Sequence, residues 1–234
     1  MLTLTQLKQY REIPYNYTSF SDKEVVCRFL GEDAWILLES LRTNRNTGRS
    51  ARMLFEVLGD MWVVDRNPYL QEDLIKNQHR WKSLIEALNS RLDLIRNRAN
   101  DNVKVLELLH SADLAVAKFE LCLSDFKQHK KRIKQALLKV THNNNIRFDA
   151  LSRSSHATDA TDWRVEYPQV VITPDTELEI ASIVKTCIEL GLTIIPRGGG
   201  TGYTGGAIPL HAKTAVINTE KLSFIGNIKN TDNL

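Results

Sequence analysis

The sequence predicts an α+β protein, with a mainly helical region at residues 1–145 and a smaller α/β region at residues 146–234. The first region carries apolar residues at intervals of three and four and contains no glycine cluster. The second region alternates short β-branched segments with one helical pattern and holds six glycines between positions 198 and 206. We therefore expect two domains of different character that meet near residue 145.

The helical region is expected to begin with a capping box. Ser21 and Glu24 stand three residues apart, ahead of the apolar residues Val25, Val26, Phe29 and Leu30. Two longer apolar stripes follow, and their spacing predicts helices that bury one face in a bundle or a long hairpin. The first stripe comprises Trp81, Leu84, Ile85, Leu88, Leu92 and Ile95, and the second comprises Val105, Leu108, Leu109, Ala112, Val116, Phe119 and Leu123.

The α/β region opens on a strand and a helix. Residues 170–172 are β-branched and end before Pro174, which predicts a short strand. Asp175 or Thr176 can cap a helix that runs to about residue 190, with acidic residues in its first turn, where the helix dipole favours them. Gly191 is expected to end this helix.

A glycine-rich loop joins the two strands that follow, at residues 192–195 and 215–217. It reads Pro196, Arg197, Gly198, Gly199, Gly200, Thr201, Gly202, Tyr203, Thr204, Gly205 and Gly206. Glycine has no Cβ, so it adopts positive φ and lets main-chain N–H groups converge on an anion. We expect Gly199 and Gly200 to use this freedom. A loop at the carboxyl end of a strand is also where open α/β sheets bind ligands, so the segment predicts half of a nucleotide-binding lobe.

Three kinds of phosphate-binding loop contain glycine-rich segments of this sort. A P-loop needs a lysine after its last glycine, and this loop has none. The dinucleotide fingerprint G-x-G-x-x-G matches residues 200–205, and Glu220 follows at the distance expected of a ribose-binding acid. That fingerprint requires a helix after the loop, but Pro209 and the short return to residue 215 leave little room for one. A third kind of loop therefore fits best.

The motif Pro-Arg-Gly-Gly-Gly-Thr-Gly, followed by Gly-Gly and a proline, resembles the pyrophosphate-binding loop of the PCMH-type FAD-binding domain. Vanillyl-alcohol oxidase, p-cresol methylhydroxylase and the glycolate and D-lactate dehydrogenases share this domain. Residues 159–164 and 167–174 resemble its entry segment, in which an Asp-containing loop leads to a strand ending in proline. The resemblance covers about residues 147–228 and implies the first lobe of such a domain, without the second.

The resemblance implies that FAD is the cofactor and that main-chain amides hold its pyrophosphate. The implied cofactor-binding residues are Pro196, Arg197, Gly198, Gly199, Gly200, Thr201, Gly202, Thr204, Gly205 and Gly206. Some members of the family carry a histidine that bonds covalently to the flavin at the position of Thr201. Threonine at that position implies FAD bound without the covalent link.

Side chains near the loop leave two interpretations open. Arg197 either meets the ligand or pairs with Asp159 or Asp162. The hydroxyls of the two loop threonines either bind phosphate or only tolerate a tight turn. His156 precedes the Asp-containing loop and belongs either to the site or to a surface loop.

The charge balance and the spacing of the cysteines bear on nucleic-acid binding and metal binding. Residues 1–150 hold 24 basic and 19 acidic residues and the remainder hold 7 and 9, so neither part predicts a specific nucleic-acid partner. A basic cluster at residues 127–134 and a basic connector at residues 42–52 are interpreted as solvated surface or as partner contacts. Three isolated cysteines, Cys27, Cys122 and Cys187, predict no metal site.

The first residues lack the basic and apolar segments of a signal peptide, and no run approaches the roughly eighteen apolar residues of a membrane span. A cytoplasmic protein without a transmembrane segment is predicted. Peripheral attachment to the inner membrane stays open, because flavin dehydrogenases of the resembled family often pass electrons to quinones.

The resemblance implies an FAD-dependent oxidoreductase that acts on a D-2-hydroxy acid such as D-lactate or glycolate. Such enzymes need a second FAD lobe and a substrate domain. We therefore expect this chain to be an amino-terminal fragment, inactive alone, that docks to domains beyond Leu234 and lacks the catalytic residues. Its helical region resembles the leader of larger bacterial FAD-linked oxidoreductases. The alternative is a non-catalytic helical interaction module whose glycine loop is vestigial.

Overall fold

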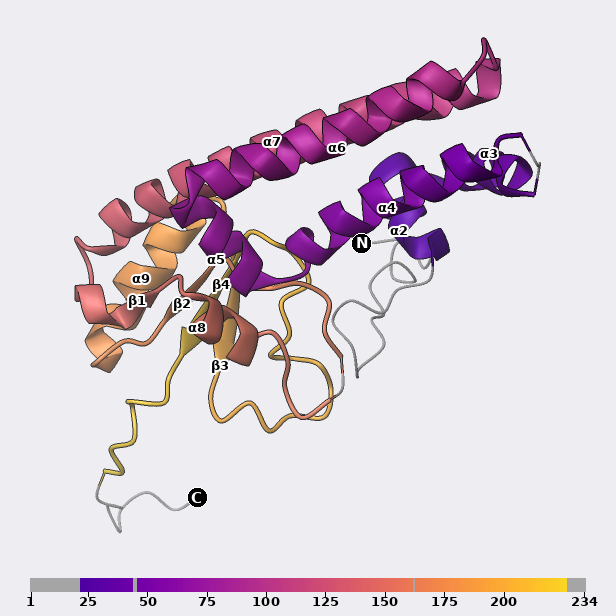
Figure 1. The fold of residues 1–234 in the computed structure, drawn as a ribbon. Coiled ribbons are helices and arrows are strands. Elements are labelled where there is room, and N and C mark those ends of the chain that lie inside the picture. The colour runs from indigo at the N-terminus through magenta and orange to yellow at the C-terminus, as the bar shows by residue number, and fades with distance from the viewer. Residues whose placement is uncertain (1–21, 44–45, 162, 227–234) are drawn as a thin grey trace. The chain divides into compact units, whose positions relative to one another are not determined.

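The computed structural model describes residues 22–43, 46–161 and 163–226, which fold as a helical unit and an α/β unit (Figure 1). The helical unit comprises residues up to 131 together with 149–151. The α/β unit comprises residues 132–148 and those from 152 onward. The structure therefore has the α+β class that the sequence predicts.

The described part of the helical unit is built mainly from six helices. They are α2 (Asp22–Leu30), α3 (Glu32–Arg42), α4 (Gly48–Asp65), α5 (Pro68–Lys76), α6 (Gln78–Arg98) and α7 (Val103–Leu137), the last of which continues into the α/β unit. Asparagines begin two of them: the Asn67 side chain accepts hydrogen bonds from Tyr69 N and Leu70 N, and the Asn77 side chain accepts one from Arg80 N. Local side-chain chemistry thus sets where these helices start.

Helices α6 and α7 form a long antiparallel hairpin (Figure 1). The ring centroids of Trp81 and Phe119 lie 5.6 Å apart, and Arg96 donates two hydrogen bonds to the carboxylate of Asp113, at 3.0 and 2.8 Å. Both bonds come from Nη2 of Arg96, one to each carboxylate oxygen, and they link the two helices. The predicted helical hairpin is therefore present.

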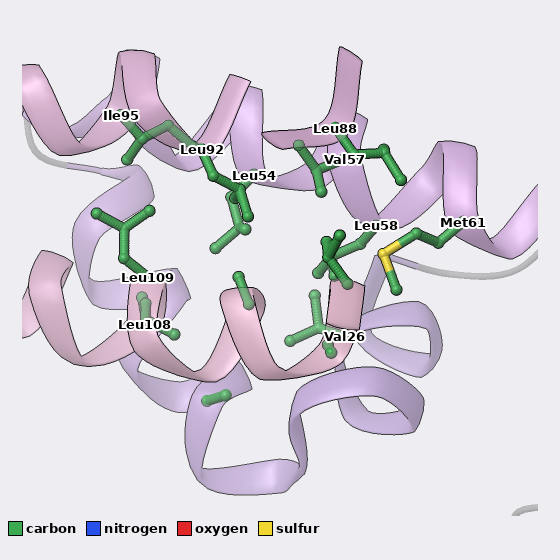
Figure 2. Close-up of a cluster of buried hydrophobic side chains, with 14 of the residues drawn as sticks. Val26, Leu54, Val57, Leu58, Met61, Leu88, Leu92, Ile95, Leu108 and Leu109 are labelled. Atoms are coloured by element: carbon green, nitrogen blue, oxygen red, sulfur yellow. The ribbon is translucent and has the colours of Figure 1, made fainter. Parts of the chain in front are cut away.

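The core of the helical unit lies where α4 meets this hairpin (Figure 2). Leu54, Val57, Leu58 and Met61 of α4 approach Leu88, Leu92 and Ile95 of α6, and Leu108 and Leu109 of α7. Both predicted stripes supply this core. Trp81 and Leu84 are only partly buried against it, and the side chain of Leu123 lies outside the described residues.

One sequence expectation for this unit is not tested, and a second is only partly met. Ser21 of the expected capping box lies outside the described residues, and α2 begins at Asp22. The basic stretch at residues 42–52 is not wholly a connector, because α4 already begins at Gly48. The Thr47 hydroxyl donates to the Leu41 carbonyl oxygen at 2.7 Å and so ties the two helices together across the short link.

The α/β unit contains a four-stranded sheet with the order β1-β2-β4-β3. Its strands are β1 (Ile146–Arg147), β2 (Val170–Ile172), β3 (Thr193–Arg197) and β4 (Thr214–Asn218). Strand β4 pairs in parallel with both β2 and β3, whereas β1 pairs antiparallel with β2. The three parallel strands were predicted, and β1 was not.

Helix α9 (Glu177–Glu189) packs on this sheet and has the predicted limits. Of the two candidate caps, the structure uses Thr176, whose main-chain N–H and hydroxyl donate to Glu179 Oε1 at 3.1 and 3.2 Å. Gly191 follows the helix with φ of 70°. Cys187 of this helix is fully buried, which raises its thiol pKa to about 11, so it serves as a core residue.

The core of the α/β unit also takes residues from the end of α7. Ile133 and Leu137 are buried together with Ile172 and Ile183. The short helices η1 (Asn143–Asn145) and α8 (Ala150–Ser155) flank β1. The division between units therefore falls at residues 131 and 132, and the domain boundary expected at residues 145 and 146 stays a prediction.

Replacing Leu88 with alanine is expected to lower the free energy of unfolding by about 2–5 kcal/mol, because a fully buried leucine leaves a cavity among packed neighbours. Leu94→Ala is the matched control, since Leu94 lies on the same helix and is 48% exposed. It should change stability by no more than about 0.5 kcal/mol. Urea denaturation followed by circular dichroism measures both, and equal losses would contradict this assignment of the core.

Candidate functional site

The parallel strands place three chain segments at one edge of the sheet. Strands β2, β4 and β3 run in the same direction, so their carboxyl ends lie together at Thr173, Asn218 and Arg197. Strand β3 extends two residues beyond the predicted end and leads directly into the glycine loop. The loop therefore lies at the edge where ligands bind to open α/β sheets.

The connection from β3 to β4 contains no helix. Residues 198–213 are all described, and none of them is helical. The return segment is held instead by a hydrogen bond from Glu166 N to Pro209 O at 3.1 Å and by burial of Ile208. This geometry excludes the dinucleotide-binding alternative, because that fingerprint needs a helix N-terminus at the loop.

Two of the six loop glycines have left-handed backbone conformations. Gly200 has φ of 68° and Gly205 has φ of 72°. The expectation for Gly199 was wrong: its φ is not positive, and a Cβ there would make only an ordinary contact with Thr201 Cγ2 at 3.7 Å. The sharp turns of the loop therefore occur at Gly200 and Gly205, which other residues adopt only with strain.

The main chain of the loop is open to solvent. Gly200 and Gly205 are half-buried, and the exposed loop residues are Gly198, Gly199, Thr201, Gly202, Tyr203, Thr204 and Gly206. No main-chain N–H of residues 198–206 donates a hydrogen bond to any part of the chain that the structure describes. The loop thus presents a run of accessible donors, which an anion can accept.

Arg197 connects this loop to the Asp-containing segment before it. Its Nη1 donates to the Thr158 carbonyl oxygen at 2.6 Å, and its guanidinium packs where a Cβ on Gly200 would lie. Burial lowers the Arg197 pKa, and the nearby charge of Asp159 partly opposes that shift. Of the two expected carboxylate partners, Asp159 acts at a distance and Asp162 lies outside the described residues.

Asp159 orders the segment that Arg197 contacts, through hydrogen bonds to Thr161. Its Oδ1 accepts hydrogen bonds from the Thr161 main-chain N–H at 2.8 Å and from the Thr161 hydroxyl at 2.5 Å. Burial acts to raise the Asp159 pKa, but these hydrogen bonds and the main chain of Ala207 lower it overall. The carboxylate is therefore used to order the segment around the loop.

His156 lies in a turn after α8, is half-buried, and contacts Asn218 at the carboxyl end of β4. Its Nδ1 lies 2.8 Å from the Ser152 carbonyl oxygen, and its Nε2 lies 2.9 Å from Asn218 Nδ2. Asn218 Oδ1 accepts from Glu220 N, so the amide nitrogen of Asn218 must face the histidine. The ring is therefore neutral, with its proton on Nδ1. Burial lowers the His156 pKa, and the charges of Arg197 and Arg147 add to that effect.

A second polar network lies at this edge of the sheet, and it was not predicted from the sequence. Lys221 Nζ donates to Asn145 Oδ1 at 2.7 Å and to Asp175 Oδ1 at 2.6 Å. Asn145 is 1% exposed and donates to Thr141 Oγ1 and to Asp175 Oδ2. The network holds the chain that leaves β4 against the end of β2. Its members are far apart in the sequence, so no local pattern could reveal it.

Metal sites and membrane-spanning helices are two further possibilities for the described residues. The described residues contain no group of three histidines, cysteines or acids that could hold a metal ion. Among those residues there is also no helix with both the length and the apolar character needed to cross a bilayer.

Comparison with known proteins gives two family matches. Residues 168–234 match the model described as FAD binding domain, and residues 8–121 match a model described as protein of unknown function (DUF3683). The chain is 34% identical over 79 residues to glycolate oxidase subunit GlcD of Bacillus subtilis, covering 34% of this chain and 17% of that protein. It is 39% identical over 54 residues to D-lactate dehydrogenase of Archaeoglobus fulgidus, covering 23% of this chain and 12% of that protein.

Among solved structures, alkyldihydroxyacetonephosphate synthase aligns with a TM-score of 0.40 and 18% identity, covering 43% of this chain and 22% of that one. The chain thus spans less than a fifth of the length of the two curated relatives.

Protonation of His156 is expected to destabilise the protein. The unfolded-state pKa is about 6.5, and the folded-state pKa is lower, so the folded protein binds fewer protons. The stability from this residue is complete above about pH 6.5 and declines as the pH falls through the folded-state value. His156→Gln should therefore lose less stability than the wild type between about pH 7.5 and pH 5.5 in urea denaturation. The same pH slope in both proteins would contradict the buried neutral ring.

Proposed function

We propose that residues 168–234, which match the model described as FAD binding domain, form part of a PCMH-type FAD-binding domain, and that their glycine loop binds the pyrophosphate of FAD. The observation that carries the proposal is the exposed main chain of residues 198–206, whose N–H groups make no hydrogen bond with the described residues. Such donors suit a pyrophosphate, because several can reach one anion without ordering long side chains.

The roles proposed for single residues follow from their geometry. The main-chain N–H groups of the loop glycines and Thr201 would face the phosphates, and Thr201 and Thr204 would add hydroxyls. The main-chain N–H of Arg197 lies in strand β3, which pairs with β4, so this residue would act through its side chain. Pro196 has no N–H, so its part is to shape the end of β3. Arg197 would supply positive charge next to Gly200, where the bond to Thr158 holds its guanidinium. Thr201 has no nitrogen nucleophile, which supports FAD bound without a covalent link.

We further propose that the protein to which this lobe contributes oxidises a D-2-hydroxy acid. Support comes from the two relatives named glycolate oxidase subunit and D-lactate dehydrogenase. When bound, FAD would accept a hydride from the carbon that bears the hydroxyl group of the substrate. The chain's own part would be to hold the pyrophosphate end of the cofactor, and none of its residues is assigned a catalytic role.

The wild-type chain is expected to bind FAD and ADP, which share the pyrophosphate and adenosine, and not riboflavin, which lacks both. Isothermal titration calorimetry measures all three. Because the loop is the common element, ADP should compete with FAD. A folded wild-type chain that binds neither nucleotide, or that binds riboflavin equally well, would contradict the proposal.

Gly205→Ala is expected to weaken ADP binding about tenfold, because alanine is strained at φ of 72° and shifts the loop donors. Gly191→Ala is the matched control: its φ is 70°, and a Cβ there meets nothing within 4 Å. Both changes should cost about 1 kcal/mol of stability, but Gly191 lies at the end of α9 and at the opposite end of β3. Equal affinity losses in the two variants would show that strain alone, and not the loop, explains the effect.

A further inference from the structure

Helix α7 carries a second apolar stripe that none of the described residues covers. The stripe consists of Val103, Leu106, His110, Leu114, Ala117 and Leu121, which recur at intervals of three and four and are all exposed. Val103 is 75% exposed, Leu114 60% and Leu121 62%. Four large apolar side chains, those of Val103, Leu106, Leu114 and Leu121, in one row on an otherwise polar helix surface indicate a contact surface.

This exposed stripe lies opposite the face that α7 buries in the core. Val105, Leu108, Ala112, Val116 and Phe119 occupy the buried face, and helical spacing puts the two rows on opposite sides of the helix. An ordinary surface helix has one apolar face. Helix α7 has two, so a second packing partner is expected on its outer side.

We propose that this partner is a second copy of the chain, with two α7 helices packed antiparallel through the exposed stripe. The spacing of the stripe suits this arrangement. With the two-fold axis at residue 112, midway between His110 and Leu114, Val103 lies opposite Leu121 of the other copy and His110 lies opposite Leu114. Leu106 lies within one residue of the level of Ala117. The contact is isologous, so each of these pairs occurs twice and the assembly closes as a dimer.

Charges beside the stripe match the same register. Glu107 and Lys118 are both exposed and lie eleven residues apart, which is about three helical turns, so they share one flank of the stripe. In the antiparallel pair Glu107 of one copy lies beside Lys118 of the other, and the reverse pair forms at the symmetric position. Flanking pairs of opposite charge are the features that set orientation in paired helices.

The dimer is expected to be weak, since the stripe is only about 27 Å long, from the rise of about 1.5 Å per residue. A single helix pair of this length lies at the low end of the area that stable interfaces bury. A dissociation constant on the order of ten micromolar is therefore expected. Sedimentation equilibrium of the full chain across about 1–200 μM should show reversible conversion of monomer to dimer.

Leu114→Glu is expected to keep the chain monomeric over this range, because it places a charge at the centre of the stripe. Ile36→Glu is the matched control, since Ile36 is 69% exposed on α3, away from the stripe, and should leave the dimer unchanged. A wild-type chain that stays monomeric throughout would overturn the proposal. So would equal weakening by both variants.

A charge-swap experiment tests the antiparallel register itself. Glu107→Lys and Lys118→Glu should each raise the dissociation constant about tenfold, because both symmetric pairs become repulsive. A mixture of the two variants should recover dimerisation, since every flank pair in the mixed dimer is again of opposite charge. Failure of the mixture to recover would rule out this register. If Leu114→Glu instead lowers the thermal stability of a monomeric wild type, the stripe packs against the chain's own residues and the proposal is wrong.

Discussion

The parallel pairing of β3 with β4 is the constraint on which the candidate site depends. Parallel neighbours cannot be joined by a hairpin, so the chain must leave the carboxyl end of β3 and travel back to the start of β4. Most α/β folds make this return with a helix, and here residues 198–213 make it without one. The main-chain N–H groups of residues 198–206 therefore make no hydrogen bond with the described part of the chain, and Gly200 and Gly205 permit the sharp turns at this sheet edge.

The surroundings of the loop hold that open main chain in place. The Arg197 side chain donates to the Thr158 carbonyl oxygen, and His156 contacts Asn218 at the end of β4. The Asp159 carboxylate accepts hydrogen bonds from Thr161 and from the main chain of Ala207. The contacts of Arg197 and His156 join the segment before β2 to the ends of β3 and β4, and Asp159 orders that segment internally. A loop that is already ordered loses less conformational entropy when an anion binds. The polar side chains therefore serve the site by positioning its backbone, whether or not they touch the ligand.

Local patterns predicted most of the fold, and long-range contacts account for what they missed. Thr176 with Glu179, Gly191 and the β-branched strands act within a few residues, so the sequence alone located α9 and the parallel strands. Pro209 correctly indicated a return without a helix. Strand β1 is two residues long and carries no periodic signal, and the network of Asn145, Asp175 and Lys221 joins residues from separate segments. The φ of Gly199 also depends on the folded loop, so the expected positive value was wrong.

The central claim is that the main chain of the glycine loop binds a pyrophosphate. Amide chemical shifts of the full chain, followed by NMR during titration with ADP, test it most directly. The claim predicts shifts that saturate for amides at residues 197–206, with little change at the amides of α4 and α6 in the helical unit. Saturating shifts confined to another surface, or an unchanged loop at millimolar ADP in a folded chain, would contradict it.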